Sequence, residues 1–132
     1  MTHRFKRDPE GGIILVTVEL DNTHTFKMVL DTAASRTTFD TTALQMAGYD
    51  VKSLVLETGV IETANGIVKV GIIETDSLTA FEHTFNGMPV QVYDFLAHGI
   101  LSDYDGLLGL DFFENMVLCI DMKNQTIEIK SA

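Results

Sequence analysis

Asp31 is the residue whose type and surroundings most clearly suggest chemistry. Residues 26–30 alternate in character and predict a strand with at least one buried face, which ends at this carboxylate. An aspartate at such a strand end commonly does no more than accept hydrogen bonds within its own turn. Here Thr32 and Ser35 supply hydroxyl groups at short range, and the two alanines between them leave room for another group to approach. Asp31 is therefore a candidate for general acid–base chemistry.

Three stretches of the chain resemble the retropepsin-like aspartic proteases. Residues 29–35, Val-Leu-Asp-Thr-Ala-Ala-Ser, resemble the catalytic D-T-G-A-S loop of that family. Residues 106–113, Gly-Leu-Leu-Gly-Leu-Asp-Phe-Phe, resemble its hydrophobic-hydrophobic-Gly element and the helix that follows. Residues 117–121 and 126–129 resemble its closing hairpin. The likeness spans residues 14–130, and the order and spacing of three motifs make it more specific than any one motif alone.

The resemblance implies an aspartic endopeptidase that acts as a homodimer. Peptide hydrolysis by carboxylates needs two of them, one to activate water and one to protonate the scissile carbonyl. The chain has a single copy of the catalytic motif, so the pair would be Asp31 from each of two identical chains on a two-fold axis. In this resemblance Thr32 bonds across the dimer to the partner loop, and Ser35 bonds the outer oxygen of Asp31. Ala33 stands where the family has its central glycine.

A second element implied by the resemblance is a flap over the substrate. Asn65 and Gly66, preceded by Ala64, form the strongest hairpin signal in the chain, because Asn-Gly tolerates positive φ at both positions. The family likeness makes these three residues the tip of a flap that closes on a peptide or protein substrate. Such a substrate would lie extended, with its backbone paired in β fashion.

Two other interpretations remain open from the sequence. Ala33 supports a catalytically silent dimeric domain that keeps the retropepsin-like fold for protein binding or assembly. A third interpretation is an unrelated β-barrel in which Asp31 merely ends a strand. A measurement of oligomeric state separates the third from the first two, and a peptidase assay on Asp31→Asn separates those two from each other.

The elements that must hold these residues are mainly strands. Residues 13–20 and 25–30 predict a first hairpin, and residues 54–62 and 67–78 predict further strands. A helix is expected from Asp40 or Thr41 to Met46, with Gly48 as its stop. Hairpin turns are expected at Asn65-Gly66 and at Asn86-Gly87. We therefore expect a mainly β protein, a small closed retropepsin-like barrel with one or two short helices.

The 132 residues predict a single domain over residues 13–132, preceded by an N-terminal arm, residues 1–12. No apolar run approaches the roughly 20 residues that span a bilayer, and no secretory signal is visible, so we expect a cytoplasmic protein without a membrane partner. Cys119, the only cysteine, is expected to be a small buried hydrophobe. The four histidines lack metal-ligand spacing, and we expect neither metal nor cofactor.

The net charge of the chain limits the kinds of molecule that it can bind. Nineteen acidic and nine basic residues give a net charge of −10, which disfavours nucleic acid as a partner because a phosphate backbone needs a basic surface. The same charge indicates that a strongly acidic peptide would be repelled by the surface as a whole.

Overall fold

The computed structural model describes residues 2–10, 12–63, 66–100 and 103–131, with the side chains of residues 61–63 and 98 left aside. Strands dominate these residues, and the helices are short. The strands are β1 (Thr2–Arg4), β2 (Lys6–Arg7), β3 (Ile14–Leu20), β4 (His24–Leu30), β5 (Thr38–Asp40), β6 (Glu57–Thr63), β7 (Gly66–Glu74), β8 (Ser77–Ala80), β9 (His83–Asn86), β10 (Pro89–Tyr93), β11 (Gly106–Leu108), β12 (Met116–Asp121) and β13 (Thr126–Ser131). The helices are α1 (Thr41–Met46) and α2 (Val51–Leu54), with 3₁₀ turns η1 (Leu96–His98) and η2 (Leu110–Phe113).

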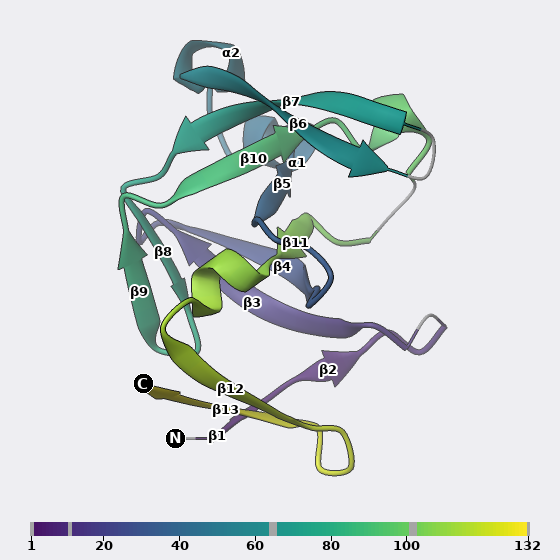
Figure 1. The fold of residues 1–132 in the computed structure, drawn as a ribbon, viewed down its shortest axis with the longest axis vertical. Coiled ribbons are helices and arrows are strands. Elements are labelled where there is room, and N and C mark those ends of the chain that lie inside the picture. The colour runs from purple at the N-terminus through teal and green to yellow at the C-terminus, as the bar shows by residue number, and fades with distance from the viewer. Residues whose placement is uncertain (1, 11, 64–65, 101–102, 132) are drawn as a thin grey trace.

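The strands form two sheets (Figure 1). The large sheet has the order β6-β7-β10-β5-β11-β4-β3-β8-β9, with β2 added beside β3, and a small sheet has the order β1-β13-β12. The expected closed barrel is wrong, because no described pairing joins β6 to β9, the two ends of the large sheet. Each end strand pairs only with its hairpin neighbour, and Figure 1 shows β6 across the top of the view and β9 at the left below it. The sheet therefore curves around its core and stays open.

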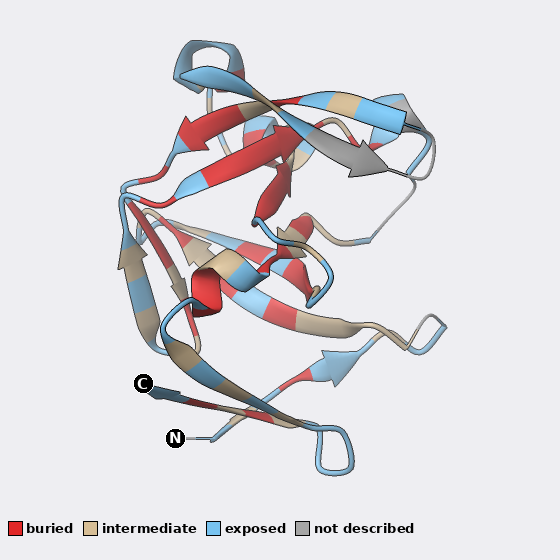
Figure 2. Cartoon of the chain, viewed as in Figure 1, coloured by how far each residue is buried: buried red, intermediate tan, exposed pale blue. Residues whose placement is uncertain are grey.

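The core follows the alternation read from the sequence. β3 and β4 pair antiparallel as expected, through a turn in which Asp21 and Asn22 have φ of 54° and 59°. Phe26, Met28 and Leu30 of β4 are all buried, and Figure 2 shows buried segments concentrated on the central strands. Fully enclosed apolar side chains from distant parts of the chain meet here: Val18, Leu20, Phe39, Leu44, Leu78, Leu108, Phe112 and Ile127. Burial of this apolar surface stabilises the strand ends that carry the site.

Two predicted strand features differ from the structure. The single strand expected over residues 67–78 is two strands, because Asp21 accepts the N–H groups of Asp76 and Ser77 and holds a corner there. The turn expected at residues 86–87 does not close a hairpin. β9 pairs with β8 through a turn at Phe81 and Glu82, whose φ values are 52° and 65°. The Asn-Gly pair connects β9 to β10, which pairs with β7 and β5 instead.

The corner at Asp21 also holds the loop after α1. The Tyr49 hydroxyl donates to Asp21 Oδ2 at 2.9 Å. Burial, and then this hydrogen bond to a carboxylate, raise the pKa of Tyr49 well above its usual value. Tyr49 is therefore a neutral hydrogen-bond donor that ties the helical segment to the first hairpin.

Helix α1 occupies its predicted place, with Asp40 at the N-cap and Gly48 at a φ of 102° after its end. The Asp40 carboxylate does not cap the helix, because it accepts the N–H of Phe95 instead. The two α-helices agree with the one or two short helices expected, although the position of α2 was not predicted. No helix among the described residues is long and apolar enough to cross a membrane.

The first residues of the chain pair with the rest of it. β1 pairs with β13 and β2 pairs with β3, so the segment called an arm contributes to both sheets. The expected burial of Cys119 is wrong, because the residue is exposed on β12. Inward-facing side chains of β12 alternate with outward-facing ones, and Cys119 shares the outward set with Val117.

Candidate active site

The site is assembled where two parallel strands end side by side. β11 lies between β4, which runs parallel to it, and β5, which runs antiparallel. Leu30 and Leu108 are register partners at the ends of β4 and β11, and the Asp31 N–H donates to Leu108 O at 3.0 Å. Residues 77 positions apart are thus adjacent, and the two motifs read from the sequence form one structure.

The Asp31 loop is a tight turn with a partly exposed carboxylate at its start. The Ala33 N–H donates to Asp31 Oδ1 at 2.9 Å, and the Ala34 N–H donates to Asp31 O at 3.1 Å. The first bond fixes the orientation of the carboxylate. Its other oxygen, Oδ2, has no hydrogen-bond partner among the described residues, so it is free to accept a proton or bind water.

Gly109 packs directly against the backbone of this loop, which is possible because glycine has no side chain. A Cβ at Gly109 would lie 2.6 Å from the carbonyl carbon of Arg36 and 2.8 Å from Ala34 O, closer than real Cβ atoms come. The next residue, Leu110, donates its N–H to Ala34 O at 2.8 Å. The backbone after β11 therefore rests directly on the backbone of the Asp31 loop, and glycine is required for that approach.

Hydrogen bonds between buried Thr37 and partly buried Asp111 fix the far end of the loop. Asp111 accepts the Thr37 N–H at 2.9 and 3.0 Å and the Thr37 hydroxyl at 2.8 Å. Thr37 Oγ1 in turn accepts the Gly109 N–H at 3.1 Å, and Asp111 also accepts the Phe112 N–H. The Thr37 side chain is completely buried. Sequence reasoning missed Thr37, although a threonine ahead of an apolar strand and an aspartate after a Leu-Leu-Gly element were visible signals.

Cavities open on both sides of the Asp31 loop. One, of about 410 Å³, is lined by the loop residues Ala33 to Arg36, by Gln91, and by Val60 of β6. The other, of about 430 Å³, is lined by Asp31, Tyr104, Met122 and their neighbours. Leu107 lines both cavities. An extended chain crossing from one cavity to the other would therefore pass the Asp31 loop.

Three of the predicted site residues near Asp31, namely Thr32, Ala33 and Ser35, are exposed. Ala33 has no positive φ, so its methyl group causes no backbone strain. No described hydrogen bond joins Ser35 to Asp31, in contrast to the bond that the resemblance implies.

The structure describes only part of the predicted flap. Ala64 and Asn65 lie outside the described residues, whereas Gly66 is exposed at the start of β7 with a φ of 120°. Thr63 and Gly66 are paired, so β6 and β7 form the expected hairpin up to its tip. Val60 brings this hairpin to the same cavity as the Asp31 loop.

Comparisons with known proteins agree with this geometry. The crystal structure of a retropepsin-like aspartic protease from Rickettsia conorii superposes with a TM-score of 0.71, at 24% sequence identity over 100% of this chain and 92% of that chain. A search of curated proteins found no match. A family model described as aspartyl protease matches residues 16–112, which make up more than half of the chain and include the motif at residues 29–35 and residues 106–112 of the second motif. The chain therefore belongs to the aspartyl protease family, and its fold is retropepsin-like.

Proposed function

We propose that the protein is a homodimeric aspartic endopeptidase whose dyad is one Asp31 from each chain. The observation that carries this proposal is the open oxygen of Asp31, held at the start of a braced loop between two cavities. A chain with one such loop needs a second copy to supply the second carboxylate.

The chemistry follows from two carboxylates that share one proton. The ionised carboxylate takes a proton from a water molecule, and that water attacks the scissile carbonyl carbon. The protonated carboxylate donates to the carbonyl oxygen, and a proton then passes to the leaving amine as the carbon–nitrogen bond breaks. The Ala33 N–H keeps Asp31 Oδ1 in a fixed direction, so Oδ2 is the oxygen available to water.

An open strand edge supports the proposed dimer. β12 pairs only with β13 among the described strands, which leaves its outer N–H and C=O groups free to pair with a second chain. Val117 on this strand and Met122 just after it are 46% and 47% exposed, and Leu110 beside the Asp31 loop is 46% exposed. Met122 lines the same cavity as Asp31, so this edge and the carboxylate share one side of the molecule. Exposed apolar side chains along and near an open strand edge favour a protein interface.

The β6–β7 hairpin is the proposed lid. Val60 and Ile67 are 60% and 70% exposed on it, and Val60 faces the cavity beside the catalytic loop. An extended peptide in that cavity would cover these side chains and pair with the hairpin backbone.

The proposal is tested by a peptidase assay with a dimer measurement. Wild type should cleave members of a mixed peptide library and sediment as a dimer, and Asp31→Asn should be a dimer without activity. Cys119, the only cysteine, reports on the interface because it lies on β12. Mild oxidation should cross-link two chains through it, and Cys119→Ser should abolish the cross-link. A chain that stays monomeric at high concentration would contradict the proposal.

A silent binding domain is the second candidate, and Ala33 favours it. The exposed Ala33 methyl lies in the cavity where the substrate would pass, and a dimer brings two such methyl groups to the two-fold axis. Cleavage by Ala33→Gly but not by wild type would support this candidate. A cytoplasmic location, and the absence of nucleic-acid and membrane partners, stay predictions.

A further inference from the structure

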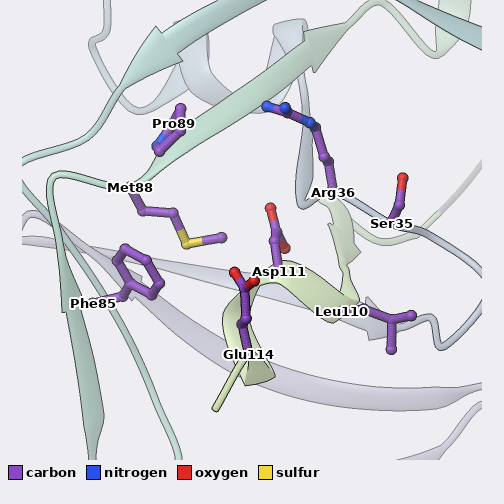
Figure 3. A pocket seen from close by; sticks show the side chains of 8 residues that line it. All are labelled: Ser35, Arg36, Phe85, Met88, Pro89, Leu110, Asp111 and Glu114. Carbon is purple, nitrogen blue, oxygen red and sulfur yellow. The ribbon is translucent and has the colours of Figure 1, made fainter.

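Arg36 is a charged residue in the cleft that the proposed reaction does not use. It follows the catalytic loop and lines the cavity of about 410 Å³ that the loop shares with Val60. It also lines an adjoining cavity of about 480 Å³ with Ser35, Met88, Pro89 and others (Figure 3). Its side chain is exposed, so the guanidinium is accessible from both cavities.

The Arg36 guanidinium has no partner among the residues that the structure describes. No hydrogen bond or ion pair joins it to any described residue, although two carboxylates line the same cavity. Asp111 is already committed to Thr37 and Phe112. Glu114 is exposed, and Figure 3 shows it beside Asp111, across the cavity from the guanidinium. A free positive charge therefore faces the cleft of a chain whose net charge is −10.

The distance from Asp31 limits which substrate residue Arg36 can meet. Five residues of extended backbone span at most about 17 Å, and the turn closed by Ala34 shortens this path. An extended peptide advances about 3.3 Å per residue. The Arg36 backbone therefore lies beside a substrate residue no more than about five positions from the scissile bond.

We propose that Arg36 determines specificity by binding a glutamate or aspartate side chain of the substrate. The inference rests on the proposed endopeptidase function and names part of its substrate class. A guanidinium donates two parallel N–H bonds to a carboxylate, a geometry that neutral side chains do not match. Ser35 adds a hydroxyl beside it, and Met88 and Pro89 offer apolar contacts to the methylene groups of a glutamate.

Distant acidic residues weaken this local attraction little, because at physiological ionic strength charges are screened over about 8 Å. The carboxylates nearest to the guanidinium are those of Asp111 and Glu114, which line the same cavity. In a homodimer each chain supplies one Arg36, and the two-fold axis places them at equal distances from the dyad. The preference for an acidic residue should therefore appear at mirrored positions on the two sides of the scissile bond.

The experiment compares matched peptides about twelve residues long, which covers the reach estimated above. One peptide bound or cleaved in a mixed library is remade with Gln, Glu or Lys at each position in turn. Cleavage by wild type gives kcat/KM, and fluorescence anisotropy with Asp31→Asn gives binding without turnover. The same series is measured on an Arg36→Gln background. Lys52→Gln, on exposed helix α2 outside both cavities, is the control that removes the same charge.

We expect Glu to be preferred over Gln by about three- to tenfold at one position and its mirror, in kcat/KM and in binding. Arg36→Gln should bring the ratio to about one, Lys52→Gln should leave it unchanged, and added salt should reduce it. Preference for Lys, or a Glu preference that survives Arg36→Gln, would overturn the inference and leave the peptidase standing. Arg36-dependent binding without any cleavage by wild type would keep the inference and reject the peptidase. A dimer that neither binds nor cleaves any peptide would reject both.

Discussion

Two aspartates near the ends of parallel strands have opposite surroundings. Asp31 directly follows β4, whereas Asp111 lies in η2, three residues after the end of β11, the strand parallel to β4 in the same sheet. The Asp111 carboxylate accepts N–H and O–H groups from Thr37 and the N–H of Phe112. The Asp31 carboxylate accepts one N–H, from Ala33, and is otherwise open among the described residues.

This difference separates a structural carboxylate from one suited to chemistry. A carboxylate whose oxygens already accept several protein donors stabilises the fold and has little room for a water or substrate group. A carboxylate oriented by one donor and open at its other oxygen can exchange a proton with water or substrate. The hydrogen bonds among Asp111, Thr37 and Gly109 fix the loop, and the open oxygen of Asp31 on that loop remains accessible to water or substrate.

The largest expected effect on stability comes from Gly109→Ala. The added methyl would meet Arg36 and Ala34 backbone at 2.6–2.8 Å, and backbone cannot move aside as a side chain can. We expect a loss of about 3 kcal/mol or more in the free energy of unfolding, measured by urea denaturation. Gly48→Ala is a matched control, since a Cβ there meets nothing within 4 Å, although its φ of 102° adds strain. Equal losses in the two variants would argue against the close backbone packing.

Asp111→Ala should be the next most damaging change. It leaves the Thr37 N–H and hydroxyl without their acceptor in a buried place, which costs about 2–4 kcal/mol of unfolding free energy. Asp31→Ala removes one exposed bond and should cost no more than about 0.5 kcal/mol. Thermal unfolding of the two variants provides the comparison, and a larger loss for Asp31→Ala would reverse the roles assigned here.

The pH dependence of cleavage tests the chemical role proposed for Asp31. In the proposed dimer two Asp31 carboxylates would lie close together at the two-fold axis and could not both ionise cheaply, so the proposed mechanism requires one proton shared between them. Raising the pH removes that proton, and kcat/KM should fall by about tenfold for each pH unit well above neutrality. A rate that climbs steadily from about pH 5 to about pH 9 is incompatible with a shared proton.

The smallest predicted effect is that of Ala33→Gly. Ala33 has no positive φ, so glycine relieves no backbone strain and only removes a methyl from the cleft. If that methyl displaces the carboxylates by a fraction of an ångström, turnover should rise by up to about tenfold. The pH profile should keep its shape, because the same carboxylates titrate in both proteins. An unchanged turnover would mean that the methyl is accommodated without cost.

Sequence reasoning succeeded where the signal was local. The alternation of β4, the carboxylate at its end and the glycine at 109 all follow from residue type and neighbours. The Thr37–Asp111 pair depends on two residues 74 positions apart becoming neighbours, which no local pattern contains. Cys119 was misjudged because the apolar side chains of β12 lie on both faces, so alternation could not tell the inward face from the outward one.

The order of the strands in the sheet was the second feature that could not be predicted from the sequence. Asn86-Gly87 carries a strong turn signal, yet β10 pairs with β7 and β5, and in this central place its side chains from Val90 to Tyr93 are buried on both faces of the sheet. Closure into a barrel was expected from the number of strands and hairpins. The pairing of the two end strands is a property of the whole sheet, and in this chain they stay apart.

The most direct test of the central claim measures activity and stability together on Asp31→Asn and Asp111→Asn. Each change removes one negative charge and keeps the side-chain shape. Asp31→Asn should lower kcat/KM at least about a thousandfold and leave the free energy of unfolding within about 0.5 kcal/mol of wild type. Asp111→Asn should lose about 1–2 kcal/mol of stability while its folded fraction still cleaves peptides. Full activity in Asp31→Asn, or none in a folded Asp111→Asn dimer, would contradict the account.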